Sequence, residues 1–388
     1  MRGQMWCSTF TTVFILVLAF VWMPYDLAKN STGTEADNQL SLSQPLTVRW
    51  QYESDQTINL TPATDGERIY LPLAEGSLVS LRALDGQLFW RTEIGGELSA
   101  SPAADQSAVY IASKTVGPPD NATRRTIGAL RALGREAGVT LWVRSFRSPL
   151  QGALAINQSM LFGGGSDGRV YAIDKRTGKF AWVMQHWSPF ASHLVVNGSR
   201  LYIGNDDGTL FSLDQATGKQ VWRYQTRGPV RGRVAVADGV VYFGSADGYV
   251  YAVDEIDGRL RWRARTGAGV QAVASVSGGL LVASLDNFVY LLSLNRGGRL
   301  WKRQLAGRLA AEPLTASDGA LFTPLSGDTG VVLDLRDGKQ LNSLPIGEDN
   351  VTTASPIVAG NMLLLTTRHG LLAFSRPVDT SNSKARQE

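Results

Sequence analysis

The sequence contains few of the residues that form covalent cross-links or metal sites. Its 388 residues include one cysteine, Cys7, and three histidines, His186, His193 and His369. One cysteine cannot form an internal disulfide, so packing must stabilise the fold. The histidines are not grouped with other metal ligands, as zinc sites usually require, and we therefore predict no metal site.

Long runs of one charge are also missing. The chain has 38 Lys and Arg against 34 Asp and Glu, with a net charge of +4. Because basic and acidic residues alternate and no basic block is interleaved with aromatics, we predict no nucleic-acid partner. A Gly-Lys-Ser/Thr phosphate loop is missing as well. The chain shows no convincing 3.6-residue period, which argues against helices.

A repeat of about 40 residues dominates the sequence. Residues 170–182, 210–222 and 250–262 are three copies, and each contains an Asp, then a Gly, and ends on Trp. Around each copy, Asn-Gly and Asp-Gly pairs supply the turns that join short antiparallel strands. A period of this length is typical of β-propellers, in which each copy is one four-stranded blade.

Degenerate copies extend the count in both directions. Residues 80–90 and 130–142 are earlier copies, separated by an insertion at 116–123, and residues 333–341 are a later one with Leu341 in the Trp position. Residues 46–52 then form a lone Trp strand, while residues 354–374 form three strands without a fourth. Pairing the two ends would complete the last blade and leave no open sheet edge. We predict an all-β fold, a single eight-bladed propeller over residues 46–377, closed by the N-terminal strand.

The repeated motif resembles the tryptophan-docking motif of the pyrroloquinoline-quinone (PQQ) repeat propellers. The resemblance implies that each repeat Trp packs against the glycine turn of a neighbouring blade. These residues are therefore interpreted as structural: Trp50, Trp90, Trp142, Trp182, Trp222, Trp262 and Trp301. The repeated Asp85, Asp174, Asp214 and Asp254 are interpreted as caps of their own turns.

Two kinds of relative in this family imply different functions. Quinoprotein dehydrogenases hold their quinone against two adjacent disulfide-linked cysteines and beside a calcium ion, and this chain has no cysteine pair. By size and blade number the chain also resembles the propeller subunit of the outer-membrane β-barrel assembly machinery, a non-enzymatic scaffold. We therefore predict no catalytic residue and no cofactor. A PQQ-binding dehydrogenase and a ligand- or polysaccharide-binding sensor remain the alternatives.

The N-terminus is predicted to direct export. Residues 10–23 are an apolar run preceded by a single charge, Arg2. Residues 1–23 are long enough to be a signal anchor, which we favour, and a cleaved signal peptide with a secreted product is the alternative. In both cases the propeller lies outside the cytoplasm, on the periplasmic or cell-surface side. Residues 24–45 are predicted to be a flexible tether and residues 378–388 a disordered tail.

Residues that depart from the repeat are the candidates for function. Loops at the ring faces carry function in propellers, because the blades are committed to packing. Three loops that join one blade to the next contain unusual side chains. Trp and Arg are common at binding hot spots, so we predict a protein-binding face at a membrane. The candidate residues are His186, Trp187, Arg231, Arg233, Glu348 and Asp349.

Overall fold

The computed structural model describes residues 40–116, 126–348 and 350–377. In these residues all regular structure is β-strand, which confirms the predicted all-β class. No helix within the described ranges is long and apolar enough to cross a bilayer. The predicted membrane segment, residues 10–23, and the predicted tail, residues 378–388, lie outside these ranges.

The strands of the described residues form six four-stranded sheets and one eight-stranded sheet. The first two sheets in chain order are β2 (Ala63–Thr64), β3 (Arg68–Leu73), β4 (Ser77–Arg82), β5 (Leu88–Glu93), and the eight-stranded sheet of β6 (Glu97–Ala104), β7 (Ala108–Val116), β8 (Thr126–Gly134), β9 (Thr140–Phe146), β10 (Leu150–Ile156), β11 (Met160–Gly165), β12 (Arg169–Asp174), β13 (Phe180–Gln185). The next three are β14 (Val195–Asn197), β15 (Arg200–Gly204), β16 (Thr209–Asp214), β17 (Gln220–Gln225); β18 (Ala235–Ala237), β19 (Val240–Gly244), β20 (Tyr249–Asp254), β21 (Leu260–Arg265); and β22 (Val270–Val276), β23 (Gly279–Ser284), β24 (Phe288–Leu292), β25 (Arg299–Gln304). The last two are β26 (Leu314–Thr315), β27 (Ala320–Phe322), β28 (Thr329–Leu333), β29 (Gln340–Pro345); and β30 (Ile357–Ala359), β31 (Met362–Thr367), β32 (Gly370–Ser375) with β1 (Thr47–Glu53).

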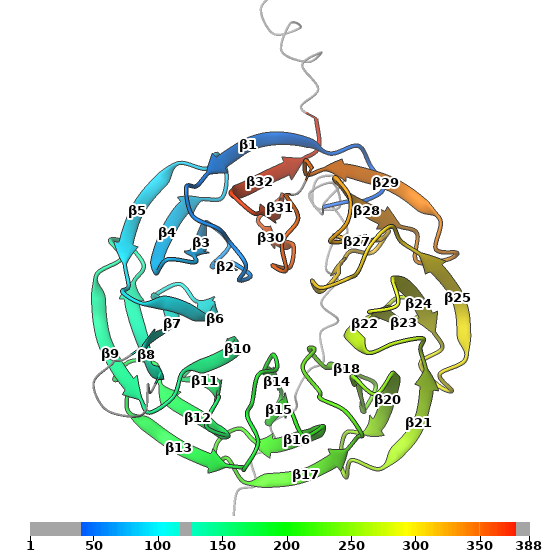
Figure 1. Ribbon diagram of the computed structural model, residues 1–388, viewed down its shortest axis with the longest axis horizontal. Helices are drawn as coiled ribbons and strands as arrows, with labels where there is room; N and C mark the ends of the chain where they lie inside the picture. The colour runs from blue at the N-terminus through cyan, green and yellow to red at the C-terminus, as the bar shows by residue number, and fades with distance from the viewer. Residues whose placement is uncertain (1–39, 117–125, 349, 378–388) are drawn as a thin grey trace, which may run out of the picture. The chain divides into compact units, whose positions relative to one another are not determined.

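The sheets lie around a central axis, with the first strand of each repeat nearest the centre and the Trp strand at the rim (Figure 1). The eight-stranded sheet is two such repeats, joined by one parallel bridge between Ser101 and Ala153. At the chain ends, β1 pairs antiparallel with β32, and Trp50 lies opposite Ala373. This is the pairing that the isolated Trp50 strand predicts.

Burial along one repeat explains its residue pattern. In β15 and β16 nearly every residue is buried, because both faces of the sheet are covered by neighbouring sheets. Both strands are therefore rich in Leu, Ile and aromatic residues, as strands buried on both faces usually are. The outer strand β17 instead alternates exposed and less exposed side chains, with Trp222 the most buried.

Seven junctions share the docking geometry that the resemblance implies. In each, the indole Nε1 of the Trp donates to a carbonyl in the turn before the next outer strand, and the ring covers a glycine of that turn. The acceptors are Ala83 for Trp50 (3.1 Å), Arg135 for Trp90 (2.9 Å), Lys175 for Trp142 (2.8 Å), Gln215 for Trp182 (3.0 Å), Glu255 for Trp222 (2.9 Å), Leu294 for Trp262 (2.7 Å) and Leu335 for Trp301 (2.9 Å).

The junction after Leu341 has no Trp, and the chain before β1 packs there instead. Leu42 is fully buried among Leu321, Leu344 and Leu363. Asp318 accepts hydrogen bonds from the backbone N–H groups of Leu42 (3.1 Å) and Ser43 (3.0 Å) and from both flanking serine hydroxyls. Residues 40–45, which the sequence places in the tether, are therefore packed against the propeller.

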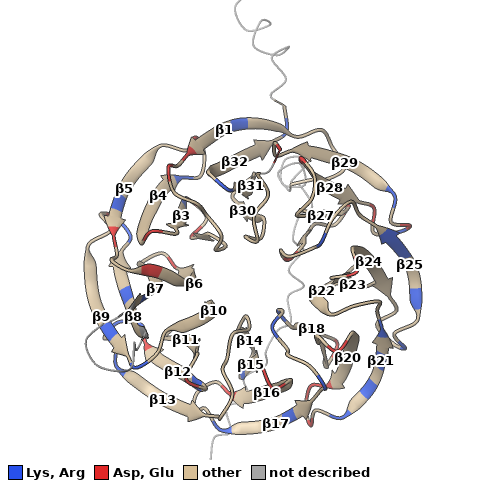
Figure 2. Ribbon diagram, in the orientation of Figure 1, with Lys and Arg blue, Asp and Glu red and all other residues tan. Residues whose placement is uncertain are grey.

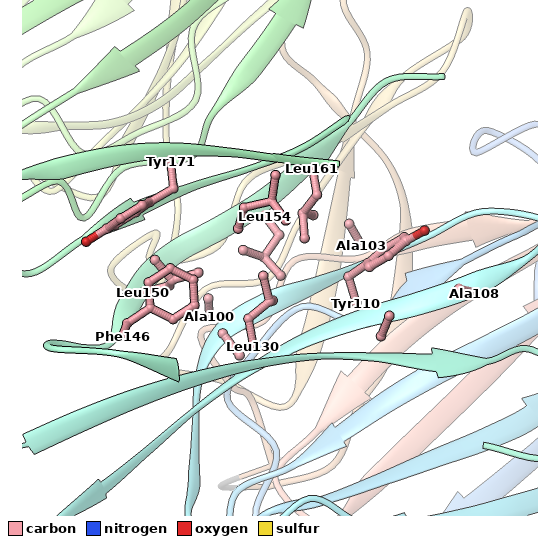
Figure 3. Packing of buried hydrophobic residues seen from close by; sticks show 13 residues of the cluster. Ala100, Ala103, Ala108, Tyr110, Leu130, Phe146, Leu150, Leu154, Leu161 and Tyr171 are labelled. Atoms are coloured by element: carbon pink, nitrogen blue, oxygen red, sulfur yellow. The ribbon is translucent and has the colours of Figure 1, made fainter. Parts of the chain in front are cut away.

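The hydrophobic core is a series of clusters, each filling the space between two neighbouring sheets or repeats. In the cluster drawn in Figure 3, Tyr110 and Leu130 of one repeat meet Leu154, Leu161 and Tyr171 of the next. Each cluster draws on two repeats, so each repeat depends on its neighbours for burial.

Candidate functional site

A four-residue turn between β15 and β16 organises the candidate site. Asn205, Asp206, Asp207 and Gly208 form this turn, and Gly208 has a φ of +90°, which favours glycine. The loop that holds His186 and Trp187 contacts one part of the turn, and the loop that holds Arg231 contacts another. Of the predicted residues, His186 and Arg231 therefore contact the same turn, and Trp187 lies next to His186 in its loop.

His186 is a partly buried link between the turn and the protein core. Its Nδ1 lies 3.1 Å from the side-chain nitrogen of Asn205 and accepts from the backbone N–H of Ser188 at 3.3 Å. Asn205 is oriented by the N–H of Thr209, which donates to Oδ1 at 2.8 Å, so its NH₂ group faces the imidazole. Because Nδ1 accepts, the ring proton lies on Nε2, which faces Asp207 Oδ2 at 3.7 Å. His186 is thus a fixed structural support.

Trp187 is the exposed end of an aromatic stack. Its side chain is 78% exposed. Its ring lies 5.4 Å from that of His186, and His186 in turn meets Phe190 at 6.1 Å and Phe211 at 5.1 Å in edge-on contacts. Both phenylalanines are buried. The stack holds a large apolar surface in water on a firm base, an arrangement that costs free energy unless a partner covers it.

Arg231 lies on the other side of the same turn. Its Nε donates to Asp206 Oδ1 at 2.7 Å, while 63% of its side chain remains exposed. The hydrogen bond to Asp206 raises the pKa of Arg231 further above its usual value, so the guanidinium stays charged. An exposed ion pair of this kind stabilises a fold little, which leaves the remaining donors of the guanidinium available to a partner.

Arg233 and the central cavity form a second polar region. A cavity of about 230 Å³ is lined by Ser99, His193, Arg231, Gln271 and Glu312, among others. His193 Nδ1 lies 2.5 Å from Glu312 Oε1, although 119 residues separate them. Burial opposes ionisation of Glu312, but the hydrogen bond from His193 and the charge of Arg233 outweigh it and lower the pKa of that carboxyl. The cavity therefore holds a hydrogen-bonded pair of His193 and Glu312.

The remaining predicted residues lie apart from these. Glu348 is exposed in the loop between β29 and β30, and within the described residues it makes no hydrogen bond or ion pair. Asp349 lies outside the described residues. The repeated Asp174 and Asp214 each accept from the N–H and hydroxyl of the Thr three residues later, and these hydrogen bonds lower the pKa of each carboxyl. They cap turns, as the sequence predicts.

Sequence reasoning missed the partners within the site. Asp206, which binds Arg231, is not among the candidate residues chosen from the sequence. A signal was available, because the equivalent positions in the neighbouring copies are Ser166 and Ala246, so the carboxylate is an addition to the repeat. The His193–Glu312 pair could not be found in this way, since only the ring brings the two residues together.

Comparison with known families gives one match that spans the propeller. The family model described as outer membrane protein assembly factor BamB matches residues 38–164, 74–194, 166–293 and 285–382. A search of curated protein sequences gives no significant match.

Solved structures with the same architecture have diverse functions. BamB from Moraxella catarrhalis superposes with a TM-score of 0.71 at 17% identity, over 86% of this chain and 98% of that one. The computationally designed Ika8 protein gives 0.72 at 17% identity, over 85% and 99%. A quinohemoprotein alcohol dehydrogenase from Pseudomonas putida HK5 gives 0.68 at 13% identity, over 85% and 76%. At such identities the likeness shows the fold alone.

Proposed function

The chain belongs to the PQQ-repeat propeller family of the outer membrane protein assembly factor BamB, and from that premise we propose that it is a non-enzymatic scaffold that binds a protein partner at a membrane. The binding face is formed by Trp187 and Arg231 around the turn at residues 205–208. The partner is a component of outer-membrane protein assembly. We further propose that the eight-stranded sheet acts as two blades, so that the ring has eight.

The exposure of Trp187 carries the proposal. An exposed tryptophan on a rigid base loses little conformational entropy on binding, and it buries a large area. Arg231 lies on the same turn and can form a bidentate hydrogen-bonded pair with a partner's carboxylate. Together they offer an apolar anchor and a charged contact, the combination found at protein-binding hot spots.

The neighbouring dehydrogenase structures support a second candidate, a PQQ-binding enzyme. The sequence argues against it, because Cys7 is the sole cysteine and those enzymes hold the quinone against a cysteine pair. We therefore retain the scaffold as the proposed function.

We also propose that the chain is exported and held at the membrane by residues 10–23. Cell fractionation with mass spectrometry of the N-terminus tests this. A membrane-bound product that retains these residues supports an anchor, and a soluble product that begins near Lys29 supports a cleaved signal. Recovery in the cytoplasm would overturn the proposal of export.

Co-purification of the full chain from its native host tests the binding face. Loss of one hot-spot side chain costs about 2 kcal/mol or more, so Trp187→Ala combined with Arg231→Ala should weaken the complex by roughly 30-fold or more. Leu84→Ala is the matched control, because Leu84 is also exposed (67%) but lies in the turn that leads into the outer strand β5, whereas Trp187 follows the end of the outer strand β13. If the double variant retains its partner as the control does, this face is not the binding site.

A further inference from the structure

Two neighbouring outer strands carry a concentration of positive charge. On β21 the cations are Arg261, Arg263 and Arg265, and on β25 they are Arg299, Lys302 and Arg303, while neither strand contains Asp or Glu. All six side chains are exposed. Figure 2 shows these blue segments side by side on the rim, at the outer edge of their sheets. We call these six residues the basic rim surface.

The fold holds the two strands next to each other. Trp262 of β21 donates to Leu294 O at 2.7 Å, and its ring covers Gly297, in the turn that leads into β25. The six cations fall into two short basic segments, residues 261–265 and 299–303, with 33 residues between them in the chain. Docking of one repeat on the next therefore creates the surface.

Several of the cations are positioned by contacts that leave their charge uncompensated. Lys302 Nζ lies 3.6 Å from the ring centre of Phe288, and Arg263 lies 5.0 Å above Tyr249. A cation over a ring face is held without being neutralised. The side chains of Arg265 and Arg299 form no ion pair or hydrogen bond with the described residues. Arg261 is the exception within the surface, since it pairs with Asp254 at 2.7 Å.

Exposed apolar side chains lie among these charges. Leu260 of β21 is 45% exposed and Leu300 of β25 is 55% exposed. Ile256, in the turn that leads into β21, is 78% exposed. The other outer strands carry fewer cations. β9 and β17 each contain a single Arg, while β5 pairs Arg91 with Glu93 and β1 carries Arg49 together with Glu53.

We propose that the basic rim surface binds the anionic face of a phospholipid bilayer. Guanidinium and ammonium groups bind the lipid phosphates, and Ile256, Leu260 and Leu300 enter the boundary between headgroups and acyl chains. Positive charge mixed with exposed aliphatic side chains is the pattern of interfacial membrane binding. A nucleic acid would use the charges but would leave the aliphatic side chains without a role, and an acidic protein is the competing outcome that the test below separates from a bilayer. The surface is separate from Trp187 and Arg231.

Lipid vesicles provide the test, with the full chain and its N-terminal segment present throughout. Co-sedimentation is measured with neutral phosphatidylcholine vesicles and with vesicles that also contain phosphatidylglycerol. The apolar N-terminal segment contributes to both, so the informative quantity is the ratio of the two partition coefficients. Each cation near such a surface contributes about 1 kcal/mol, or roughly fivefold in partitioning, so Arg265→Gln with Arg299→Gln should lower that ratio by roughly 30-fold. Arg49→Gln is the control and should leave it unchanged.

Hydrogen exchange locates the contact within the chain. Peptides that contain β21 and β25 should gain protection with anionic vesicles and not with neutral ones, and 0.5 M salt should abolish the gain. Ile256→Ser should weaken binding while leaving its salt dependence in place. The proposal is overturned if anionic vesicles bind no better than neutral ones, if the double variant keeps the wild-type ratio, or if poly-glutamate protects these strands and vesicles do not.

Discussion

Trp50 covers Gly86 across the junction where the two ends of the propeller meet. A Cβ at Gly86 would lie 2.5 Å from the Trp50 ring, and the indole donates to the nearby Ala83 carbonyl. Trp50 lies on β1, which pairs with β32 in the last sheet. Its side chain docks on the turn before β5, so it joins the last sheet to the sheet of β2–β5. The N-terminal strand is therefore the outer strand of the last sheet, and its Trp50 packs against the core.

Removing this contact should destabilise the whole propeller. Trp50→Ala should lower the free energy of unfolding by about 3 kcal/mol, because it deletes a large, partly buried ring and a hydrogen bond. Deletion of residues 46–53 should cost more. Thermal and denaturant unfolding measure both, and Gln51→Ala on the same strand is the exposed control. An unchanged melting temperature after the deletion would show that β1 does not complete the last sheet.

A comparison of two glycines distinguishes the cost of backbone strain from the cost of disturbing a Trp contact. Gly218 and Gly198 both have positive φ, +70° and +53°, but a Cβ at Gly218 would lie 2.4 Å from the Trp182 ring, and one at Gly198 would meet nothing within 4 Å. Alanine at either position adds strain of about 1 kcal/mol, and at Gly218 it should add about 1–3 kcal/mol from overpacking. Equal losses on chemical denaturation would contradict a role for the ring contact.

The carboxyl group of Asp318 should make the free energy of unfolding depend on pH in the acidic range. Burial disfavours its charge, but hydrogen bonds from Ser41, Ser43 and the N–H of Leu42 outweigh that effect and lower the pKa of Asp318 to about 2. The folded pKa is below the unfolded value of about 3.9, so the stabilisation is present above pH 4 and is lost as the pH falls towards 2. Solvent screening reduces the expected contribution to about 1 kcal/mol.

Denaturant titrations at pH 6 and pH 2.5 measure this contribution. The difference in unfolding free energy between wild type and Asp318→Asn should be larger at pH 6, and Ser43→Ala should give an intermediate difference. A difference that does not vary with pH would show that the Asp318 contacts do not hold residues 41–43.

The propeller should not bind PQQ. Titration with PQQ and Ca²⁺ should give no saturable absorbance change and no dye-linked alcohol oxidation, because the cysteine pair that holds the quinone in the dehydrogenases is missing. A known quinoprotein dehydrogenase is the positive control. Stoichiometric binding at micromolar concentration would favour the enzyme.

The repeat made most of the fold predictable. The Trp, Gly and Asp positions recur because each is required by the same docking contact or turn, and such local requirements can be seen in one copy. The role of Leu42 could not be predicted in this way. Leu42 takes the place of the missing Trp at the junction after Leu341, and the residues that it contacts lie on strands that are far from it in the sequence.

The candidate site was predictable only in part. Trp187 and Arg231 could be selected from the sequence because they depart from the repeat. Only the structure shows that their two loops contact the same turn, which joins β15 to β16. The basic rim surface was not predicted from the sequence, because its two basic segments, residues 261–265 and 299–303, belong to different repeats and are brought together only by the docking of those repeats.

Photocrosslinking from position 187 in the native host tests the scaffold proposal most directly. A photoreactive residue replaces Trp187, a second variant carries it at position 84, and the captured species are identified by mass spectrometry. The account predicts an adduct with an outer-membrane assembly protein from position 187, reduced by Arg231→Ala and not formed from position 84. Capture of only a polysaccharide or a small ligand at position 187, or the same adduct from both positions, would contradict it.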